Sequence, residues 1–357
     1  MYKPSPLLCN LFKRICINTG LSKNNSSNLI LSLLQVHIPV DKNMAQDRKH
    51  VVEFLDKMLV DSSKLASDEK LCSYKGVLYP STLCHPETLQ ALETFEARRD
   101  DVIMAGYPKS GTHWLGEILN NLSITAAKYT KEEMKKRTDL EKELTITPRL
   151  EFGDPGKFKR MEKLPSRRII LTHLTPNILP KSIFRNKAKV LVLIRNPKDT
   201  LVSFFHFNNN TPAFPKRTWD AYFTDFMNGK VSWGFYFDFV KEWDKHIDDE
   251  NVTAVSYEDL KENPNLGVKR IAKFLGFSLT EEEIQSVVEK SSFKTMKDSG
   301  QETLGAFGDI IFRKGAVGDW KTLFSESQSK EMDRKFEEYL VGTKLGGQIK
   351  YDIYCKM

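Results

Sequence analysis

Residues 101–122, DVIMAGYPKSGTHWLGEILNNL, decide the fold of this chain. The first seven, DVIMAGY, are typical of a buried β-strand, and the apolar residues beyond the glycine-containing loop recur at the spacing of one helical face. These apolar residues are Leu115, Ile118, Leu119 and Leu122. A strand that passes through a short loop into an amphipathic helix predicts the βα unit from which parallel sheets are built.

Three further apolar segments predict neighbouring strands, at residues 168–173, 189–195 and 251–257. The last is followed by two amphipathic helices, one ending at Gly276 and one beginning with a capping box at Thr280. Because short apolar strands alternate with amphipathic helices, the sequence predicts an α/β fold with a central parallel β-sheet and helices on both faces. Nearer the N-terminus, we expect a helix from residue 46, a strand over residues 75–80 and a helix over residues 87–98.

Composition and charge narrow the classes of function. The chain has 357 residues, 40% hydrophobic and 28% charged, which excludes a collagen-like or wholly disordered protein. No apolar stretch approaches the roughly 18 residues of a membrane-spanning helix, so no membrane partner is expected. The net charge is +7, and part of it lies in the acid-free first forty residues. A nucleic acid partner is therefore not indicated, whereas a small polyanion remains open.

The number and spacing of the cysteines indicate the redox compartment of the protein. The five cysteines are odd in number and lack C-x-x-C spacing, which disfavours disulfides or zinc and favours a reducing, cytoplasmic compartment.

Residues 1–43 are rich in Ser, Asn and Leu, and we interpret them as a disordered extension or as sequence before an alternative start at Met44. No linker divides the remainder, so residues 44–357 are expected to form a single domain.

The loop between the first strand and its helix is the first candidate site. Its sequence is YPKSGTHW, residues 107–114. Backbone N–H groups at such a helix start form an anion cradle, to which Lys109 adds a charge and Ser110, Thr112 and His113 add hydrogen bonds. It is not a Walker A motif, because the lysine precedes the only loop glycine. The alternative is that these polar residues merely cap the helix.

Two further cationic segments are candidates. Arg195 ends a predicted strand, where open α/β sheets bind ligands, and Ser203 lies on the following helix. Arg313, Lys314 and Gly315 form a cationic, flexible loop that suits a phosphate. The alternatives are an arginine paired with a carboxylate, a serine that packs in its helix, and a solvated charge run.

His173 is the fourth candidate, at the end of the predicted strand RIILTH. A lone histidine is more often structural than catalytic. Its position at a strand end near the other candidates favours a general base.

In order and spacing, these four signals resemble the cytosolic sulfotransferases. Those enzymes move a sulfuryl group from 3′-phosphoadenosine 5′-phosphosulfate (PAPS) to a hydroxyl or an amine. The similarity covers nearly everything after Met44, and VSWG-YFDF (residues 231–239) and KTLFSE-Q (residues 321–328) resemble the 6B branch. The resemblance implies a P-loop-like sulfotransferase fold, PAPS as co-substrate, no metal, and a small, mostly apolar acceptor such as a phenol.

The resemblance also implies roles for residues of several segments. The 5′-phosphosulfate would be held by Lys109, Ser110, Gly111, Thr112, His113 and Trp114, with Trp114 near the adenine. The 3′-phosphate would be held by Arg195, Ser203, Arg313, Lys314 and Gly315. The rest of the nucleotide would contact Tyr257, Ser291, Ser292, Phe293, Lys294, Thr295 and Met296. His173 would be the base, and Lys109 would stabilise charge on the leaving phosphate. Without the resemblance, Tyr257 and Phe293 would be interpreted as core aromatics.

The sequence departs from the family near the predicted base. Many relatives have K-T-H-L-P, but here Leu171 replaces the lysine and Thr175 the proline. One cation near the sulfuryl group is therefore missing, which puts catalytic efficiency in doubt. In the loop, His113 replaces the usual second threonine, and a neutral imidazole can still donate one hydrogen bond.

The family's dimer motif, K-x-x-x-T-V-x-x-x-E, is also incomplete. Lys321 matches, whereas Ser325, Glu326 and Lys330 replace the threonine, valine and glutamate. We therefore expect a monomer or a weak homodimer.

Two other functions stay open at this stage. Leu171 favours a non-catalytic protein that binds PAPS or adenosine 3′,5′-bisphosphate (PAP) without transfer. A related P-loop kinase or nucleotide hydrolase is disfavoured, because no Walker A motif is present.

Overall fold

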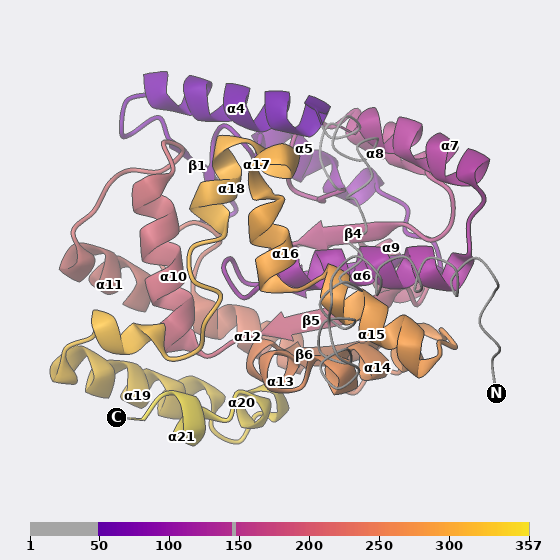
Figure 1. The fold of residues 1–357 in the computed structure, drawn as a ribbon. Helices are drawn as coiled ribbons and strands as arrows, with labels where there is room; N and C mark the ends of the chain where they lie inside the picture. Colours follow the sequence, from indigo (N-terminus) through magenta and orange to yellow (C-terminus); the bar gives the residue numbers. More distant parts are fainter. Residues whose placement is uncertain (1–48, 145–147, 357) are drawn as a thin grey trace, which may run out of the picture. The chain divides into compact units, whose positions relative to one another are not determined.

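A four-stranded parallel sheet lies at the centre of the described chain, in the order β4-β3-β5-β6 (Figure 1). Its strands are β3 (Val102–Gly106), β4 (Ile169–Thr172), β5 (Lys189–Ile194) and β6 (Val252–Ser256). The computed structural model describes residues 49–144 and 148–356, so the predicted extension over residues 1–43 lies outside it. The parallel sheet with its helices confirms the predicted α/β class.

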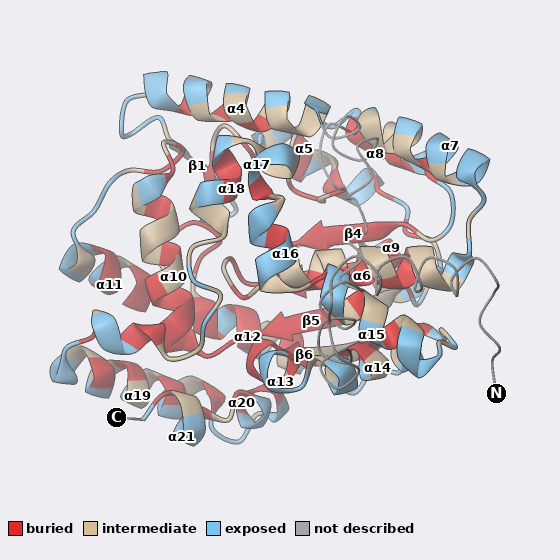
Figure 2. Cartoon of the chain, in the orientation of Figure 1, coloured by how far each residue is buried: buried red, intermediate tan, exposed pale blue. Residues whose placement is uncertain are grey.

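Both faces of the sheet are buried, as Figure 2 shows for the strands. Alternate residues of β3 face opposite sides: Ile103 and Ala105 belong to one apolar cluster and Met104 to the other. The cluster around Met104 is completed by α6 (Thr112–Ala127), α14 (Pro264–Leu275) and α15 (Glu281–Lys290). The cluster on the other face includes α10 (Pro197–Asn210), α12 (Tyr236–Asp244) and α19 (Glu326–Leu340).

The remaining elements are two longer helices, α4 (Lys49–Lys64) and α7 (Lys131–Lys142), and a set of mostly short strands and helices. The strands are β1 (Leu71–Tyr74) and β2 (Val77–Pro80). The other helices are α5 (Pro86–Gln90), α8 (Lys157–Glu162), α9 (Lys181–Arg185), α11 (Trp219–Met227), α13 (Tyr257–Glu262), α16 (Phe293–Asp298), α17 (Gly300–Leu304), α18 (Ala306–Ile311), α20 (Lys344–Gln348) and α21 (Tyr351–Tyr354), with 3₁₀ turns at Ala91–Thr94 and Asp319–Thr322.

Two predicted elements near the N-terminus are corrected. The expected strand over residues 75–80 is an antiparallel hairpin of β1 and β2, because Lys75 and Gly76 adopt positive φ and turn the chain. The expected helix over residues 87–98 stops at Gln90 and continues only as a 3₁₀ turn. Beyond the turn, Ser182 holds the backbone by accepting from the Ala97 N–H and donating to the Phe95 carbonyl.

Capping residues bound several of the helices, and the two signals predicted at Gly276 and Thr280 are confirmed. Asn196 caps α10 by accepting from the Asp199 N–H at 2.8 Å, and Gly276 ends α14 in the left-handed conformation. Thr280 and Glu283 form the expected capping box of α15.

The sheet topology brings four sequence segments to one edge. The loop of residues 107–111 follows β3, His173 follows β4, Arg195 follows β5, and Tyr257 follows β6. Because the strands are parallel, their carboxyl ends meet at the same edge, where open α/β sheets bind ligands.

Candidate active site

The loop after β3 is shaped by its backbone. The Ser110 N–H donates to the Tyr107 carbonyl at 3.1 Å, and Lys109 and Gly111 both have positive φ, 70° and 104°. The Ser110 side chain is fully buried, and its hydroxyl has no hydrogen-bond partner among the described residues. A buried hydroxyl without a partner is costly unless a ligand satisfies it. This fits the anion cradle predicted for the loop better than helix capping alone.

Gly111 is needed because the loop approaches Tyr257 closely. A Cβ at this position would lie 2.6 Å from Tyr257 Cδ2. The Tyr257 ring meets the Trp114 ring edge-on at 5.4 Å between centroids, and the Arg195 guanidinium carbon lies 4.3 Å from the Tyr257 centroid. Tyr257 therefore contacts both the predicted segment of residues 107–114 and Arg195, a position that the sequence pattern alone did not distinguish from the core.

The Gly111→Ala variant should bind PAP, the nucleotide that the resemblance implies, about tenfold or more weakly, because both the positive φ and the new Cβ displace the loop. Calorimetric titration measures the affinity. Gly347→Ala is the control, since a Cβ there has no atom within 4 Å. Unchanged affinity in the Gly111 variant would separate the loop from nucleotide binding.

Arg195 ties two loops together. Its Nη1 donates to the Lys109 carbonyl at 2.9 Å and its Nη2 to the Ala316 carbonyl at 3.1 Å, while its buried Nε has no partner in the described parts of the chain. Arg195 thus forms no carboxylate pair among the described residues, contrary to the structural alternative. Ser203 is half-buried further along α10.

The third candidate loop is held by Asp319, although Lys314 stays exposed. Arg313 and Lys314 both pair with Asp319, and although burial acts to raise the pKa of that carboxyl, the hydrogen bonds from Lys314 and Arg313 lower it overall. The Gly318 N–H in turn donates to Asp199 of α10 at 2.7 Å. These contacts hold the cationic loop beside the end of β5.

The segment after α15 joins the same region. A Cβ at Gly315 would collide with the Phe293 ring. The Lys261 ammonium lies 5.8 Å from the centroids of both Trp114 and Phe293. Sequence reasoning missed Lys261, because its proximity to both rings arises only when α6, α13 and α16 come together.

The other predicted residues of this segment differ in burial. Ser291 and Met296 are buried, and the Ser291 hydroxyl accepts from Asn121 at 3.1 Å. Ser292 caps α16 by accepting from the Thr295 N–H at 3.1 Å. Lys294 and Thr295 are exposed, so the structure does not bury their side chains in a pocket.

His173 is held in one tautomer. Its Nδ1 lies 2.6 Å from the Gly106 carbonyl oxygen, so Nδ1 carries the proton and donates, and Nε2 keeps its lone pair. Its backbone N–H donates to Glu151 at 2.8 Å, and Thr172 donates to the other Glu151 oxygen. Burial lowers the pKa of His173 below its ordinary value, so the imidazole is neutral at pH 7. This arrangement suits a general base.

Aromatic side chains surround the imidazole. The Trp233 ring lies 5.1 Å from the His173 ring and the Phe152 ring 6.2 Å from it, measured between centroids. Sequence reasoning used the segment of Trp233 only to identify the branch of the family and did not place it in the site. Phe204 is fully buried in the core cluster, whereas Phe152 is only half-buried.

Lys109 lies in an environment that disfavours its charge. Burial, together with the neighbouring Arg195 and Arg313, lowers the pKa of Lys109 to about 7. Its ammonium lies 4.4 Å from the centroid of the Phe207 ring. A polyanion bound beside these three cations would favour the protonated form, which again fits the predicted ligand.

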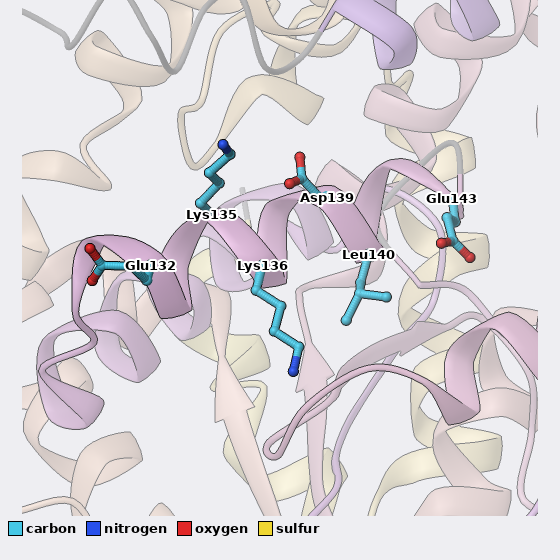
Figure 3. A pocket seen from close by; sticks show the side chains of 6 residues that line it. All are labelled: Glu132, Lys135, Lys136, Asp139, Leu140 and Glu143. Carbon is cyan, nitrogen blue, oxygen red and sulfur yellow. The ribbon is translucent and has the colours of Figure 1, made fainter.

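The described residues contain no group of three or more His, Cys, Asp or Glu side chains that could hold a metal ion. The surface hollow shown in Figure 3 lies along α7 and is lined by five charged residues and one leucine. Its residues are Glu132, Lys135, Lys136, Asp139, Leu140 and Glu143, none of which was predicted to act.

Comparisons with known proteins identify the family of the chain. A family model described as the sulfotransferase domain matches residues 99–344. Sulfotransferase 6B1 of Mus musculus is 48% identical over 312 residues and that of Homo sapiens 49% over 313, each covering 87% of this chain and 99% of the relative.

Solved structures with a similar fold include a sulfotransferase and a retinol dehydratase. The structure of mouse sulfotransferase SULT7A1 complexed with PAP is 33% identical, with a TM-score of 0.70, and covers 79% of this chain and 98% of that one. Retinol dehydratase in a complex with retinol and PAP is 21% identical with a TM-score of 0.60, covers 81% of this chain and 95% of that one, and supports the fold alone.

Proposed function

Because the chain belongs to the sulfotransferase family, in its 6B branch, and is a PAPS-dependent sulfotransferase, we propose that His173 is its general base. We propose further that the acceptor is a small, mostly apolar molecule with a hydroxyl or an amine, such as a phenol. The observation that carries this proposal is the hydrogen bond from His173 Nδ1 to the carbonyl of Gly106, which leaves Nε2 as a base beside the phosphate loop.

The donor would be held by the predicted residues of the loops. The unpartnered Ser110 hydroxyl and Arg195 Nε fit phosphate oxygens, and the ring of Trp114 fits an adenine. PAPS supplies the sulfuryl group when bound. Lys109 would stabilise the charge that grows on the leaving phosphate, and Arg195, with Arg313 and Lys314, would bind the 3′-phosphate. No metal is required for these roles.

The chemical step follows from the state of His173. Nε2 would accept the proton of the acceptor hydroxyl as its oxygen attacks sulfur in line. The enzyme would act mainly by positioning and by electrostatics, because sulfuryl transfer resembles phosphoryl transfer with a loose transition state.

The acceptor class is supported by the rings around His173. The ring centroids of Trp233 and Phe152 lie 5.1 Å and 6.2 Å from that of the imidazole, so apolar rings adjoin the proposed base. An aromatic acceptor could pack against them while its hydroxyl reaches Nε2.

A panel of acceptors offered with labelled PAPS tests the proposal. Phenols, iodothyronines, steroids, alcohols and arylamines are incubated separately, and labelled products are counted. We expect the phenols to be sulfated most efficiently. Sulfation of alcohols alone would contradict the acceptor class, and PAP binding without any transfer would favour the non-catalytic alternative.

We also propose a cytoplasmic location, a single catalytic domain over residues 44–357, and a monomer or weak homodimer without nucleic acid or membrane partners. The described cysteines are free, which supports a reducing compartment. None of the helices in residues 49–144 and 148–356 is long and apolar enough to cross a bilayer.

The proposed oligomeric state is supported by the start of α19, where Lys330 pairs with Glu326. This pair makes the surface polar at the position where the family motif has a valine. Sedimentation would measure the oligomeric state.

A further inference from the structure

Arg149 is a cation of the site that neither the motifs nor the resemblance identified. Its segment runs parallel to β4, with Arg149 bridged to Leu171. Two backbone hydrogen bonds make this bridge: the Leu171 N–H donates to the Pro148 carbonyl at 2.8 Å and the Leu150 N–H to the Leu171 carbonyl at 3.1 Å. Paired residues of parallel strands lie on the same face, so Arg149 lies on the face of Leu171.

Arg149 is half-buried, and no ion pair or hydrogen bond joins its guanidinium to a carboxylate within residues 49–144 and 148–356. Its Nη2 donates to His113 Nε2 at 3.4 Å, its carbon lies 5.2 Å from the Phe152 centroid, and its buried Nε has no partner in the same residues. The neighbouring Glu151 carboxylate attracts the guanidinium through its charge, which opposes the effect of burial on the pKa of Arg149, but its hydrogen bonds are made with Thr172 and the His173 N–H. Burial lowers the pKa of Arg149 to about 10, so the group is charged at pH 7.

These contacts place Arg149 between the donor loop and the proposed base. His113 belongs to the start of α6, immediately after the phosphate loop, whereas Phe152 packs near His173. Burial is the main reason why the pKa values of the His113 and His173 imidazoles are lowered, and the charges of Arg149 and Lys109 lower both further. A half-buried guanidinium that makes no direct ion pair, and whose Nε has no partner, is suited to bind an anion, because an unsatisfied charged group in such a place is otherwise costly.

We propose that Arg149 is a further catalytic residue, whose guanidinium binds the sulfuryl oxygens as that group passes from donor to acceptor. The inference rests on the proposed function, with His173 as base. In the step, a bond forms between the acceptor oxygen and sulfur, and the bond from sulfur to the bridging phosphate oxygen breaks. That oxygen keeps the electron pair, and the acceptor proton goes to His173 Nε2. Arg149 thereby supplies, from the segment bonded to Leu171, the cation that position 171 lacks.

The test compares two nucleotides that differ by the sulfuryl group. PAPS and PAP are titrated by calorimetry, without acceptor, into the wild-type protein and the variants Arg149→Gln and Arg149→Lys. Arg185→Gln is the matched control, because that arginine is 63% exposed and pairs with Glu96. Circular dichroism confirms that each variant is folded.

We expect Arg149→Gln to bind PAPS about tenfold or more weakly, with PAP affinity within about twofold of wild type. Its kcat with a neutral phenol should fall about 10²-fold, and Arg149→Lys should recover part of this loss. Unchanged PAPS affinity would overturn the proposal. So would a loss confined to the KM of carboxylate-bearing phenols, which would assign Arg149 to the acceptor. If the wild-type protein sulfates nothing, the proposed function fails, yet the two nucleotide affinities still decide the role of Arg149.

Discussion

Replacement of His173 by alanine should lower the rate of sulfuryl transfer by about 10²–10⁴-fold, the usual contribution of a positioned general base. The affinity for PAP should stay close to wild type, because the known contacts of the imidazole are with Gly106, Trp233 and Phe152 rather than with the cationic loops. Transfer of label from PAPS measures the rate, and calorimetry measures the affinity.

The pH profile gives a second readout for the same residue. The pKa of His173 is lowered by burial from its ordinary value of 6.5, and only the neutral imidazole can accept a proton. Near pH 7 a small change of pH should therefore not alter the protonation of His173 enough to affect the rate. The rate should decline only as the pH falls through the lowered pKa of His173. This acidic limb should be absent from the residual activity of His173→Ala.

The control for this variant is His85→Ala, which removes an exposed imidazole ahead of α5 that makes no capping hydrogen bond. It should behave as wild type. Equal losses of transfer and of PAP affinity in His173→Ala would instead mean that His173 supports the structure of the site.

Replacement of Lys109 by alanine should lower kcat by about 10²–10³-fold, because a preorganised charge next to the leaving phosphate is lost. PAP binding should also weaken. The environment of Lys109, with Arg195 and Arg313 nearby, lowers its pKa to about 7. At pH 8 the free protein therefore holds this amine largely neutral, and a bound polyanion should protonate it.

Proton uptake is the distinguishing measurement for Lys109. Titrations with PAP at pH 8, in buffers of different ionisation enthalpy, should show uptake by wild type and a clear reduction in Lys109→Ala. For the same reason, PAP affinity should decrease as the pH rises above about 7. Lys163→Ala, which removes an exposed ammonium paired with Glu143, should change neither quantity. Full activity and unchanged uptake in Lys109→Ala would remove its proposed role.

Much of the fold was predictable because its signals are local. Short apolar runs such as residues 189–195 are typical of interior strands, and capping boxes such as Thr280 with Glu283 use hydrogen bonds within one turn of the chain. The predicted helix over residues 87–98 was wrong beyond Gln90. There the extended backbone at Phe95 and Ala97 is bonded to Ser182, a residue far along the chain that no local pattern reveals.

In the candidate site, too, the residues that lie in contiguous motifs were predictable from the sequence, and those brought together by tertiary contacts were not. Amino-acid order alone identified the loop with Lys109 and Gly111, the strand-end His173 and Arg195, and through them the family, since each belongs to a contiguous motif. Contacts between distant segments could not be predicted in this way. Arg149 beside His113, and Lys261 near both Trp114 and Phe293, depend on how strands and helices pack, and no spacing along the chain encodes their proximity. Whether a charged side chain lies unpaired at a reacting centre is a property of its neighbours in space, so it emerged only from the folded arrangement.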